Sequence, residues 1–322
     1  MPTVSVIVPN FNHAPFLEKR LTTVLDQSYR DTEVIVLDDA STDRSRDIIA
    51  QFTEDERVRT DFRTANSGSA TAQWNRGVKM ASGKYVWIAE SDDYADLDLL
   101  CTLVEILDQH SDVGLAYCES TVVDKADCQI RSAAHWSAMV DPDRWTRPFI
   151  NDGRDECARF FVIQNLMPNA SAVVFRRRLY EEVGGADERY TMAGDYEVWT
   201  RMLMRSGVAF TPQRLNFFRD HEKNVRSKYS STYRFLEEDY NILDMIRQQV
   251  SVSFESLNLA LDRRLNDWAY LHLIRQPRIN WMLNWYIYRR ARRSDPAIHR
   301  RFARYWHDHI RRVKPHPNRF HP

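Results

Sequence analysis

Short apolar, β-branched segments alternate with helical segments through the first 118 residues, and this alternation restricts the fold more than any other feature. Strands are predicted at 4–8, 34–37, 58–62, 85–89 and 113–118, and helices at 16–27, 44–52, 70–80 and 97–109. Such an order predicts an α/β fold with a mostly parallel sheet flanked by helices. Sheets of this kind bind their ligands beyond the carboxyl ends of the strands.

Carboxylates follow two of the predicted strands. Asp38-Asp39 comes directly after the second strand, and Glu90-Ser91-Asp92-Asp93 comes after the fourth. Acids at the end of a buried strand repel one another unless a cation lies among them, and hard divalent cations favour oxygen ligands. The fourth strand therefore predicts either a metal-diphosphate site or an Asp-rich turn before the next helix, and its own residues do not decide between the two.

The loop after the first strand, Pro9-Asn10-Phe11-Asn12-His13, contains turn-forming residues but no Gly-rich phosphate-binding pattern. No Lys-bearing phosphate loop is found elsewhere in the sequence. Backbone amides are therefore not the expected diphosphate ligands. A metal bound at the acids would instead neutralise the charge of a bound nucleotide. The missing Gly-rich loop argues against the usual dinucleotide-binding fold.

Beyond the fifth strand the sequence is less regular. Residues 121–152 mix polar residues with Trp and Pro and predict a long loop or flap. A strand at 170–175, a helix at 178–183 and a Gly184-Gly185 turn are predicted next. Asp195 lies where another helix begins, so it is either an N-cap or a carboxylate positioned to act as a general base.

The composition is that of an ordinary globular protein, with 43% hydrophobic and 12% aromatic residues. At 322 residues the chain can form one large domain with an appendage, or two domains. No apolar stretch approaches the roughly 20 residues that a membrane-spanning helix needs, and the chain starts on a strand without an apolar leader, so a cytoplasmic protein is expected. The spacing of the four cysteines suits neither a metal site nor a disulfide framework and favours free thiols.

A formal net charge of zero hides a basic tail. From Asp262 to the end there are 15 Lys or Arg against four Asp, so this segment carries +11 and the rest of the chain −11. Helices are predicted at 229–250, 254–274, 279–293 and 296–313, the later ones rich in Arg and aromatic residues. They suit either the surface of an anionic membrane or packing against the first domain or a second subunit. No known module indicates nucleic-acid binding.

Eight short motifs follow one another between residue 3 and about residue 226. They are Val4–Asn12, Leu37–Asp43, Asn66–Gly68, Trp74–Gly77, Ala81–Tyr85, Ser91–Asp93, Gly194–Trp199 and Phe218–His221. In this order they resemble the inverting family 2 glycosyltransferases of the GT-A fold, and the remaining third of the chain lies outside the resemblance. The resemblance implies a Rossmann-like GT-A catalytic domain at 1–228, with a nucleotide-sugar half at about 1–118 and an acceptor half at about 119–228. Residues 229–322 would form a helical, basic C-terminal appendage.

The resemblance also implies a donor site at the strand ends. The residues that would hold the base and ribose of the nucleotide are Pro9, Asn10, Phe11, Asn12, Asp38 and Asp39. Asn66 and Gly68 would flank the nucleotide, while Arg219 and His221 would approach the diphosphate or the metal. For Arg219 and His221 a structural ion pair with a neighbouring acid is the alternative.

The chemistry that the resemblance implies depends on three acids. Asp92 and Asp93 would form the site for Mn²⁺ or Mg²⁺, one binding it directly and the other reaching the ribose or a bound water. Asp195 would deprotonate the acceptor hydroxyl, which displaces the nucleotide diphosphate in one step and inverts the sugar C1. Two positions depart from the family pattern: Glu90 stands where an Asp is usual, so it is left out of the metal ligands, and Trp74 replaces an Arg, which weakens any phosphate contact there.

The sequence therefore predicts a metal-dependent glycosyltransferase that uses a UDP-sugar, or a dTDP- or GDP-sugar, to extend a bacterial surface glycan. The acceptor would be a glycan hydroxyl, lipid-linked if the enzyme works at the inner face of a membrane. A sugar nucleotidyltransferase is disfavoured because Pro9–Asn12 lacks a Gly-rich loop. A non-catalytic carbohydrate-binding or scaffold protein is disfavoured because Asp92, Asp93 and Asp195 are all present.

Overall fold

The computed structural model describes residues 2–167, 169–221, 233–270 and 280–311. The chain divides into two compact units, the first made of Met1–Glu156 with Asn165–Asp220 and the second of Cys157–Gln164 with His221–Pro322. The domain boundary expected at residue 228 lies outside the described residues.

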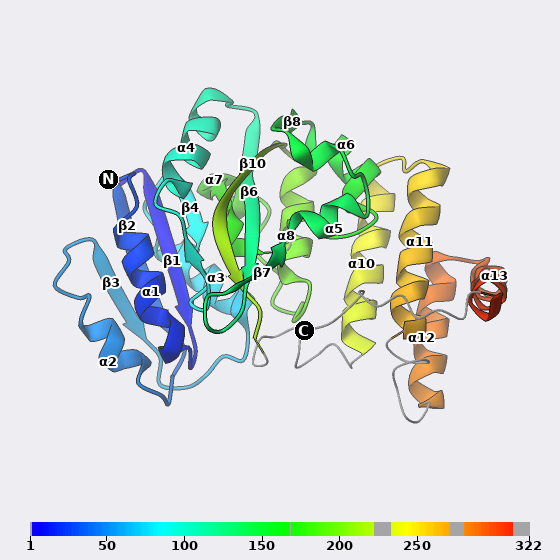
Figure 1. The fold of residues 1–322 in the computed structure, drawn as a ribbon, viewed down its shortest axis with the longest axis horizontal. Coiled ribbons are helices and arrows are strands. Elements are labelled where there is room, and N and C mark those ends of the chain that lie inside the picture. The colour runs from blue at the N-terminus through cyan, green and yellow to red at the C-terminus, as the bar shows by residue number, and fades with distance from the viewer. Residues whose placement is uncertain (1, 168, 222–232, 271–279, 312–322) are drawn as a thin grey trace. The chain divides into compact units, whose positions relative to one another are not determined.

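Within the described residues, a mixed sheet of ten strands forms the centre of the first unit, with its main path ordered β3-β2-β1-β4-β9-β6-β10-β5 (Figure 1). The strands on this path are β1 (Val4–Asn10), β2 (Thr32–Asp38), β3 (Val58–Phe62), β4 (Tyr85–Ile88), β5 (Tyr94–Ala95), β6 (Val113–Val123), β9 (Val173–Arg176) and β10 (Gly207–Arg219). The α/β fold is confirmed. The sheet is parallel from β3 to β4 and between β6 and β10, whereas β9 runs antiparallel between β4 and β6.

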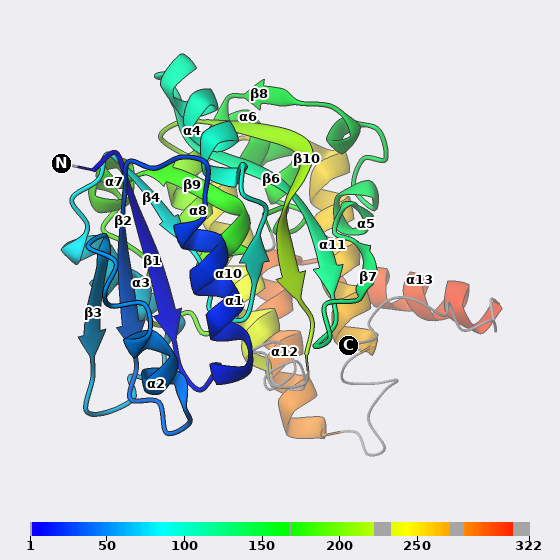
Figure 2. The same ribbon diagram turned by 60° about the vertical axis from the view of Figure 1, so that its left-hand side comes forward.

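Helices cover both faces of this sheet, which explains why the first strands are buried along their whole length. All seven residues of β1 and of β2 are buried. One face shares a core with α1 (Ala14–Leu25), α2 (Ser45–Ala50) and α4 (Leu99–Gln109), and Figure 2 shows α1 lying in front of β1. The other face packs on α3 (Ala70–Met80), α7 (Arg177–Glu182) and α8 (Gly194–Leu203).

Local signals in the sequence explain the sharp bounds of α3. Ser69 is its N-cap, with Oγ accepting from the N–H of Ala72 at 3.2 Å. At Gly77 the helix comes so close to β1 that an added Cβ would lie 2.3 Å from Ile7 Cγ2. The predicted bounds 58–62 and 70–80 are confirmed for β3 and α3.

The prediction of a long loop or flap at 121–152 is wrong. β6 continues to Val123, and the segment adds β7 (Gln129–Ser132) next to β6 and β8 (Phe149–Asn151) next to β10, with α5 (Ala134–Ala138) between them. β7 and β8 are short and pair on one side only, and their residues are exposed or half-buried. They therefore lack the apolar pattern by which a strand is predicted.

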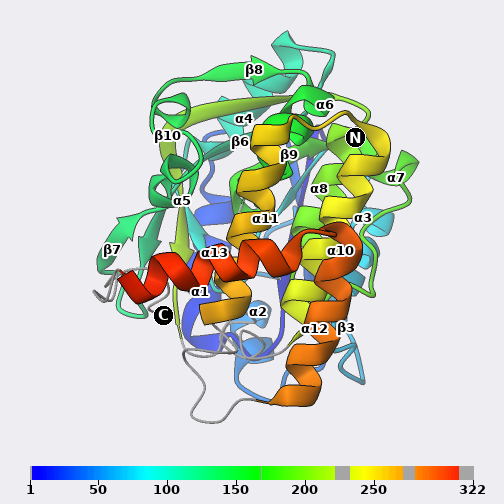
Figure 3. The same cartoon turned by 90° about the vertical axis from the view of Figure 1, so that its right-hand side faces the viewer.

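The second unit is helical, as predicted for the described parts of the tail (Figure 3). Its helices are α10 (Tyr233–Gln249), α11 (Phe254–Ala269), α12 (Trp281–Ser294) and α13 (Ile298–Arg311). The guanidinium of Arg264 is fully buried between α11 and α10, where it pairs with Asp239 at 2.8 Å and donates to the carbonyl of Val162 at 3.1 Å. In the described part of the chain we find no helix with both the length and the apolar character needed to cross a bilayer.

Candidate functional site

The acidic loop after β4 is fixed to the second half of the sheet through Asp93. The Asp93 carboxylate is 2% exposed and accepts hydrogen bonds from Asn169 Nδ2 (2.9 Å), Ser171 Oγ (2.7 Å) and the N–H of Arg219 (2.8 Å). Because both of its oxygens are bonded and shielded from solvent, Asp93 holds the loop in place. Asp92, which is half-buried, is the more accessible carboxylate of the pair.

A fully buried arginine lies beneath the acidic loop. The guanidinium of Arg20 donates to the carbonyl of Glu90 (2.7 Å) and to Ser171 Oγ (3.1 Å), and it lies 3.8 Å from the Asp93 carboxylate. Burial lowers the pKa of Arg20 to about 10, although the nearby carboxylates favour the charged form. Since this value is still above neutral pH, Arg20 remains cationic and offsets part of the negative charge of the loop.

Burial and mutual repulsion raise the pKa values of the acids in the loop. Burial, followed by the charge of Asp92, raises the pKa of Glu90 to about 8 and that of Asp93 to about 6. Trp74 Nε1–H donates to Glu90 Oε1 at 2.7 Å. The two positions that depart from the family pattern are therefore in contact with each other, and the Glu90 carboxyl is held by the Trp74 side chain.

A histidine lies next to Asp92. A ring nitrogen of His13 and a carboxylate oxygen of Asp92 are within 4.8 Å of each other, and His13 Nδ1 lies 2.8 Å from Ser91 Oγ. After burial, the charge of Asp92 is the next cause of the raised pKa values of Glu90 and Asp93, and a bound cation would relieve this repulsion. Carboxylate oxygen suits Mg²⁺ and Mn²⁺ alike, whereas an imidazole nitrogen favours a transition metal. These residues would fit a divalent ion.

The loops after β1 and β2 are joined by buried polar side chains. Pro9 and Asn10 form the buried end of β1. Asp38 is fully buried and accepts from Asn10 Nδ2 (3.1 Å), the N–H of Ser41 (3.1 Å) and Arg46 Nε (2.8 Å). The Asp38 carboxylate therefore shapes both loops from within, and its direct contact with a nucleotide stays a prediction.

Two residues in these loops have positive φ, Asn12 at 58° and Ala40 at 62°. Asn12 tolerates this conformation, and its Oδ1 accepts from the N–H groups of Thr42 (2.7 Å) and Asp43 (3.2 Å). Ala40 is strained there because its Cβ disfavours the left-handed region, and such strain concentrates at ligand sites. Phe11 is 43% exposed, which leaves its ring open to a ligand.

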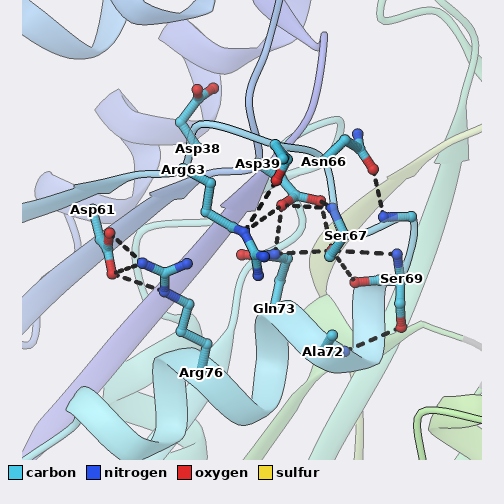
Figure 4. Close-up of polar contacts among 12 residues, drawn as sticks. Asp38, Asp39, Asp61, Arg63, Asn66, Ser67, Ser69, Ala72, Gln73 and Arg76 are labelled. Carbon is cyan, nitrogen blue, oxygen red and sulfur yellow. Dashed lines mark hydrogen bonds and ion pairs between the residues drawn. The ribbon is translucent and has the colours of Figure 1, made fainter.

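Asp39 organises the turn before α3 (Figure 4). Its carboxylate, 4% exposed, accepts from the N–H and Oγ of Ser67 (2.9 and 2.6 Å) and from Gln73 Nε2 (2.8 Å), and Arg63 Nε lies 3.4 Å away. The strand end at Asp39 and the start of α3 are thus one polar cluster. A nucleotide bound at this edge would meet a preformed loop.

Asn66 and Gly68 are exposed residues of the turn that Asp39 stabilises. Asn66 Oδ1 accepts from the N–H of Gly68, whose φ of +70° lies in the left-handed region that glycine adopts readily. Both residues are placed where they can flank a ligand, and their contact with a nucleotide stays a prediction.

Arg219 ends β10 and is only 2% exposed. Its guanidinium donates to the carbonyls of Asp92 and Asp124 (both 2.8 Å) and pairs with Asp127 at 2.5 Å. A structural ion pair is therefore present, although its partner is Asp127 and not an acid adjacent in sequence. Arg219 fastens the acidic loop to the turn after β6. The next candidate, His221, belongs to the second unit.

Asp195 lies in the first turn of α8, where the helix dipole favours a carboxylate. The N-cap is Ala193, so the interpretation of Asp195 as the N-cap is wrong. Asn165 Nδ2 donates to Asp195 Oδ2 at 3.0 Å, and Asp195 Oδ1 accepts from the N–H of Tyr196 at 2.7 Å. The carboxylate is half-buried and oriented by these bonds.

One short segment connects Asp195 with the acidic loop. Asn165 bonds Asp195, and four residues further on Asn169 bonds Asp93, with Ser171 beside it. The Cα atoms of Asn165 and Asn169 are therefore at most about 14 Å apart. Asp195 and the acidic loop are therefore bonded to side chains of the same short segment.

A pocket opens along the same segment. Its lining includes Glu119, Ser120, Trp136, Ser137, Leu166 and Met167. Burial raises the pKa of the Glu119 carboxyl. The volume of this pocket is about 20 Å³, which is enough for a water molecule but not for a sugar.

Sequence reasoning did not assign His13, Arg20, Asn165, Asn169 or Ser171 to the site. A signal existed for Arg20, because it occupies the apolar stripe of α1 among buried leucines and valines. A charged residue at such a position is almost never buried without a partner. The other four depend on contacts across the sheet that the sequence does not display.

Known proteins resemble this chain in sequence. The model of the family described as Glycosyl transferase family 2 matches residues 5–184. TuaG of Bacillus subtilis, named a putative teichuronic acid biosynthesis glycosyltransferase, is 40% identical over 111 residues, which are 34% of this chain and 44% of TuaG. The chain spans about half, or less, of the length of the curated relatives that it matches first.

Solved structures share the fold. Residues 1–349 of S. aureus TarS in complex with UDP-GlcNAc align with a TM-score of 0.63 at 18% identity, covering 83% of this chain and 73% of that one. The mannosyltransferase PcManGT from Pyrobaculum calidifontis, in complex with GDP-Man and Mn²⁺, aligns with a TM-score of 0.59 at 18% identity, covering 98% and 81%. The GT-A fold is therefore shared with both.

Proposed function

Because the chain belongs to glycosyl transferase family 2, we propose that it transfers a sugar from a nucleotide diphosphate to a hydroxyl of a glycan, with inversion at C1 and with a divalent metal. The observation that carries this proposal is the segment that links Asp195 to Asp93. This segment bonds both the half-buried carboxylate of Asp195 and the acidic strand end, which supports a shared site for donor and acceptor.

Asp92 and His13 would hold the metal, and Asp93, Arg20 and Arg219 would fix the loop around it. When bound, Mn²⁺ or Mg²⁺ supplies positive charge that stabilises the departing diphosphate. Asp93, named above as a metal ligand, has its contacts on the protein side, so in this proposal Asp92 binds directly and Asp93 positions it.

Asp195 would accept the proton of the acceptor hydroxyl. As the proton moves to Asp195 Oδ, the hydroxyl oxygen forms a bond to C1 and the bond from C1 to the diphosphate oxygen breaks. The amide of Asn165 keeps the carboxylate in one orientation during this step. A single displacement inverts the anomeric centre, and the products are a glycoside and a nucleoside diphosphate.

A UDP-sugar is the favoured donor, with dTDP- and GDP-sugars as the other candidates. Phe11 would lie against the base, Asn12, Asp38 and Asp39 would shape the base and ribose site, and the Asn66–Gly68 turn would flank it. TarS with UDP-GlcNAc and PcManGT with GDP-Man support a nucleotide-sugar of either kind. Direct diphosphate contacts by Arg219 and His221 belong to the same proposal.

The acceptor we propose is a growing surface polysaccharide, lipid-linked at the inner face of a membrane. The name of the relative TuaG supports a polysaccharide. The C-terminal helices would contact the membrane or a second subunit.

Donor hydrolysis tests this function. The protein is incubated with UDP-, dTDP- and GDP-sugars in Mn²⁺, in Mg²⁺ and in EDTA, and release of the nucleoside diphosphate is followed. We expect slow, metal-dependent release from one nucleotide class, fastest with Mn²⁺. Absence of binding and of hydrolysis for all donors in both metals would contradict the proposal.

A further inference from the structure

Helix α12 exposes an unusual amount of apolar surface. Its buried side consists of Asn284, Ile287, Ala291 and Ser294, spaced as one face of a helix. On the opposite side four large side chains face solvent within the first six residues: Trp281 (76% exposed), Met282 (86%), Trp285 (61%) and Tyr286 (45%). Contiguous exposed apolar side chains of this size mark an interaction surface.

The same exposed side continues into a cationic end. Arg289, Arg292 and Arg293 are exposed there, and at 100° per residue they fall within the arc occupied by Trp281 and Tyr286. Arg290, by contrast, points to α10 and pairs with Asp244 at 2.9 Å. Among the described residues, no carboxylate pairs with the three exposed arginines, so their charge is available to an external anion.

A cavity of about 270 Å³ lies at this cationic end. It is lined by Glu237, Asn241, Tyr286, Arg289, Arg290 and Arg293. Glu237 Oε1 accepts from Tyr286 Oη and Asn241 accepts from Arg290, so one carboxylate stands in the wall against three arginines, and the balance of charge is positive. What the cavity offers a ligand is the N–H groups of Arg289 and Arg293, and the guanidinium group binds phosphate oxygens in a bidentate manner.

We propose that this face of α12 docks on an anionic phospholipid membrane. Trp281, Trp285 and Met282 would enter the headgroup region, where indole rings favour the boundary between water and hydrocarbon. Arg289 and Arg293 would bind a lipid phosphate in the cavity. The proposal decides between the two contacts left open above for the C-terminal helices, and it does not depend on the transferase activity, because membrane binding is measured without any sugar donor.

A second copy of the chain is a less suitable occupant. α12 contains no Asp or Glu, so an isologous contact through this face would bring no anion to the arginines of either copy. An anionic membrane supplies both of the missing partners, an apolar layer for the indoles and phosphates for the guanidinium groups. Charge complementarity therefore favours the lipid surface.

Vesicle co-sedimentation tests the proposal. The full chain, in 0.1 M salt without donor or metal, is mixed with vesicles of phosphatidylglycerol or of phosphatidylcholine. We expect binding to the phosphatidylglycerol vesicles only, with release at 0.5 M salt. The double change Arg289→Gln with Arg293→Gln should weaken binding roughly 30-fold. Trp281→Ala with Trp285→Ala should weaken it at least roughly 10-fold.

The matched control removes two exposed arginines from the first unit, Arg178→Gln with Arg189→Gln. Both pair with a nearby carboxylate, Glu182 and Asp187, and we expect unchanged vesicle binding. Equal binding to both vesicles, or no binding to either, would overturn the proposal. A loss of vesicle binding in the control equal to that in the α12 variants would also overturn it. A wild-type dimer that dissociates when Trp281 and Trp285 are changed to Ala would overturn it too, because α12 would then be a subunit interface.

Discussion

The pKa of Glu90 makes a quantitative prediction about the metal-free protein. In the folded state the pKa of this carboxyl is about 8, against 4.5 for a free glutamate. Between these values the folded protein keeps a proton that the unfolded chain has released. The stability that Glu90 contributes is therefore fully present below about pH 4.5 and is lost as the pH rises through about 8.

The change that isolates this effect is Glu90→Gln. Glutamine is neutral at every pH and keeps an oxygen that can accept the 2.7 Å hydrogen bond from Trp74. When the folded state binds one proton more than the unfolded state, the free energy of unfolding falls by about 1.4 kcal/mol for each pH unit. From pH 6 to pH 7.5 the free energy of unfolding of the wild type should therefore fall by about 2 kcal/mol relative to the variant.

Urea unfolding of both proteins in EDTA, at pH 6, 6.75 and 7.5, measures this difference. Titrating groups that do not interact with Glu90 are common to the two proteins and cancel, whereas the charges of Asp92 and Asp93 are part of the effect that the comparison measures. A difference that stays constant within about 0.5 kcal/mol over this range would refute the account of Glu90. Added Mn²⁺ should reduce the pH dependence, because a cation near Asp92 stabilises the ionised form of the loop.

Two further changes test the packing and the base. Gly77→Ala should lower the free energy of unfolding by about 1–2 kcal/mol, because overpacking against Ile7 exceeds the gain in helix propensity. Urea unfolding measures this loss, with Lys79→Ala at an exposed position of the same helix as the control. A loss equal to that of the control would contradict the close approach of Gly77 to Ile7. Asn165→Ala should lower kcat roughly 10- to 100-fold with the donor KM unchanged, because Asp195 loses an orienting hydrogen bond. An Asn165→Ala enzyme with an unchanged kcat, measured by steady-state transfer, would remove Asn165 from the mechanism.

Local signals were enough to predict most of the first unit. Continuous apolar runs identified β1, β2 and β4. β7 and β8 were missed because their pairing partners, β6 and β10, supply their stability while their own residues stay partly exposed. An edge strand of this kind is specified by tertiary contacts more than by its own sequence.

The candidate site was predicted as a set of residues but not as an arrangement. The sequence grouped Asp92 with Asp93, yet their environments differ because Asn169, Ser171 and Arg219 reach only Asp93. These contacts join residues about 80 to 130 positions apart, so no local pattern contains them.

The two departures from the family pattern, Glu90 and Trp74, are a second case in which a contact between distant elements leaves no local pattern in the sequence. Each of Glu90 and Trp74 looked like an isolated exception in the sequence. In the fold Trp74, on α3, donates to Glu90 at the end of β4. A single contact thus connects two departures that look independent in the sequence.

The role of Asp195 is the central claim, and Asp195→Asn tests it most directly. The amide has nearly the same shape as the carboxylate but does not accept the acceptor's proton at neutral pH. Donor binding in Mn²⁺ by titration calorimetry and transfer to a glycan acceptor should be measured on the same preparation. We expect donor affinity within about twofold of the wild type and transfer reduced at least roughly 1,000-fold. Full transfer activity in Asp195→Asn, with normal donor binding, would contradict the account.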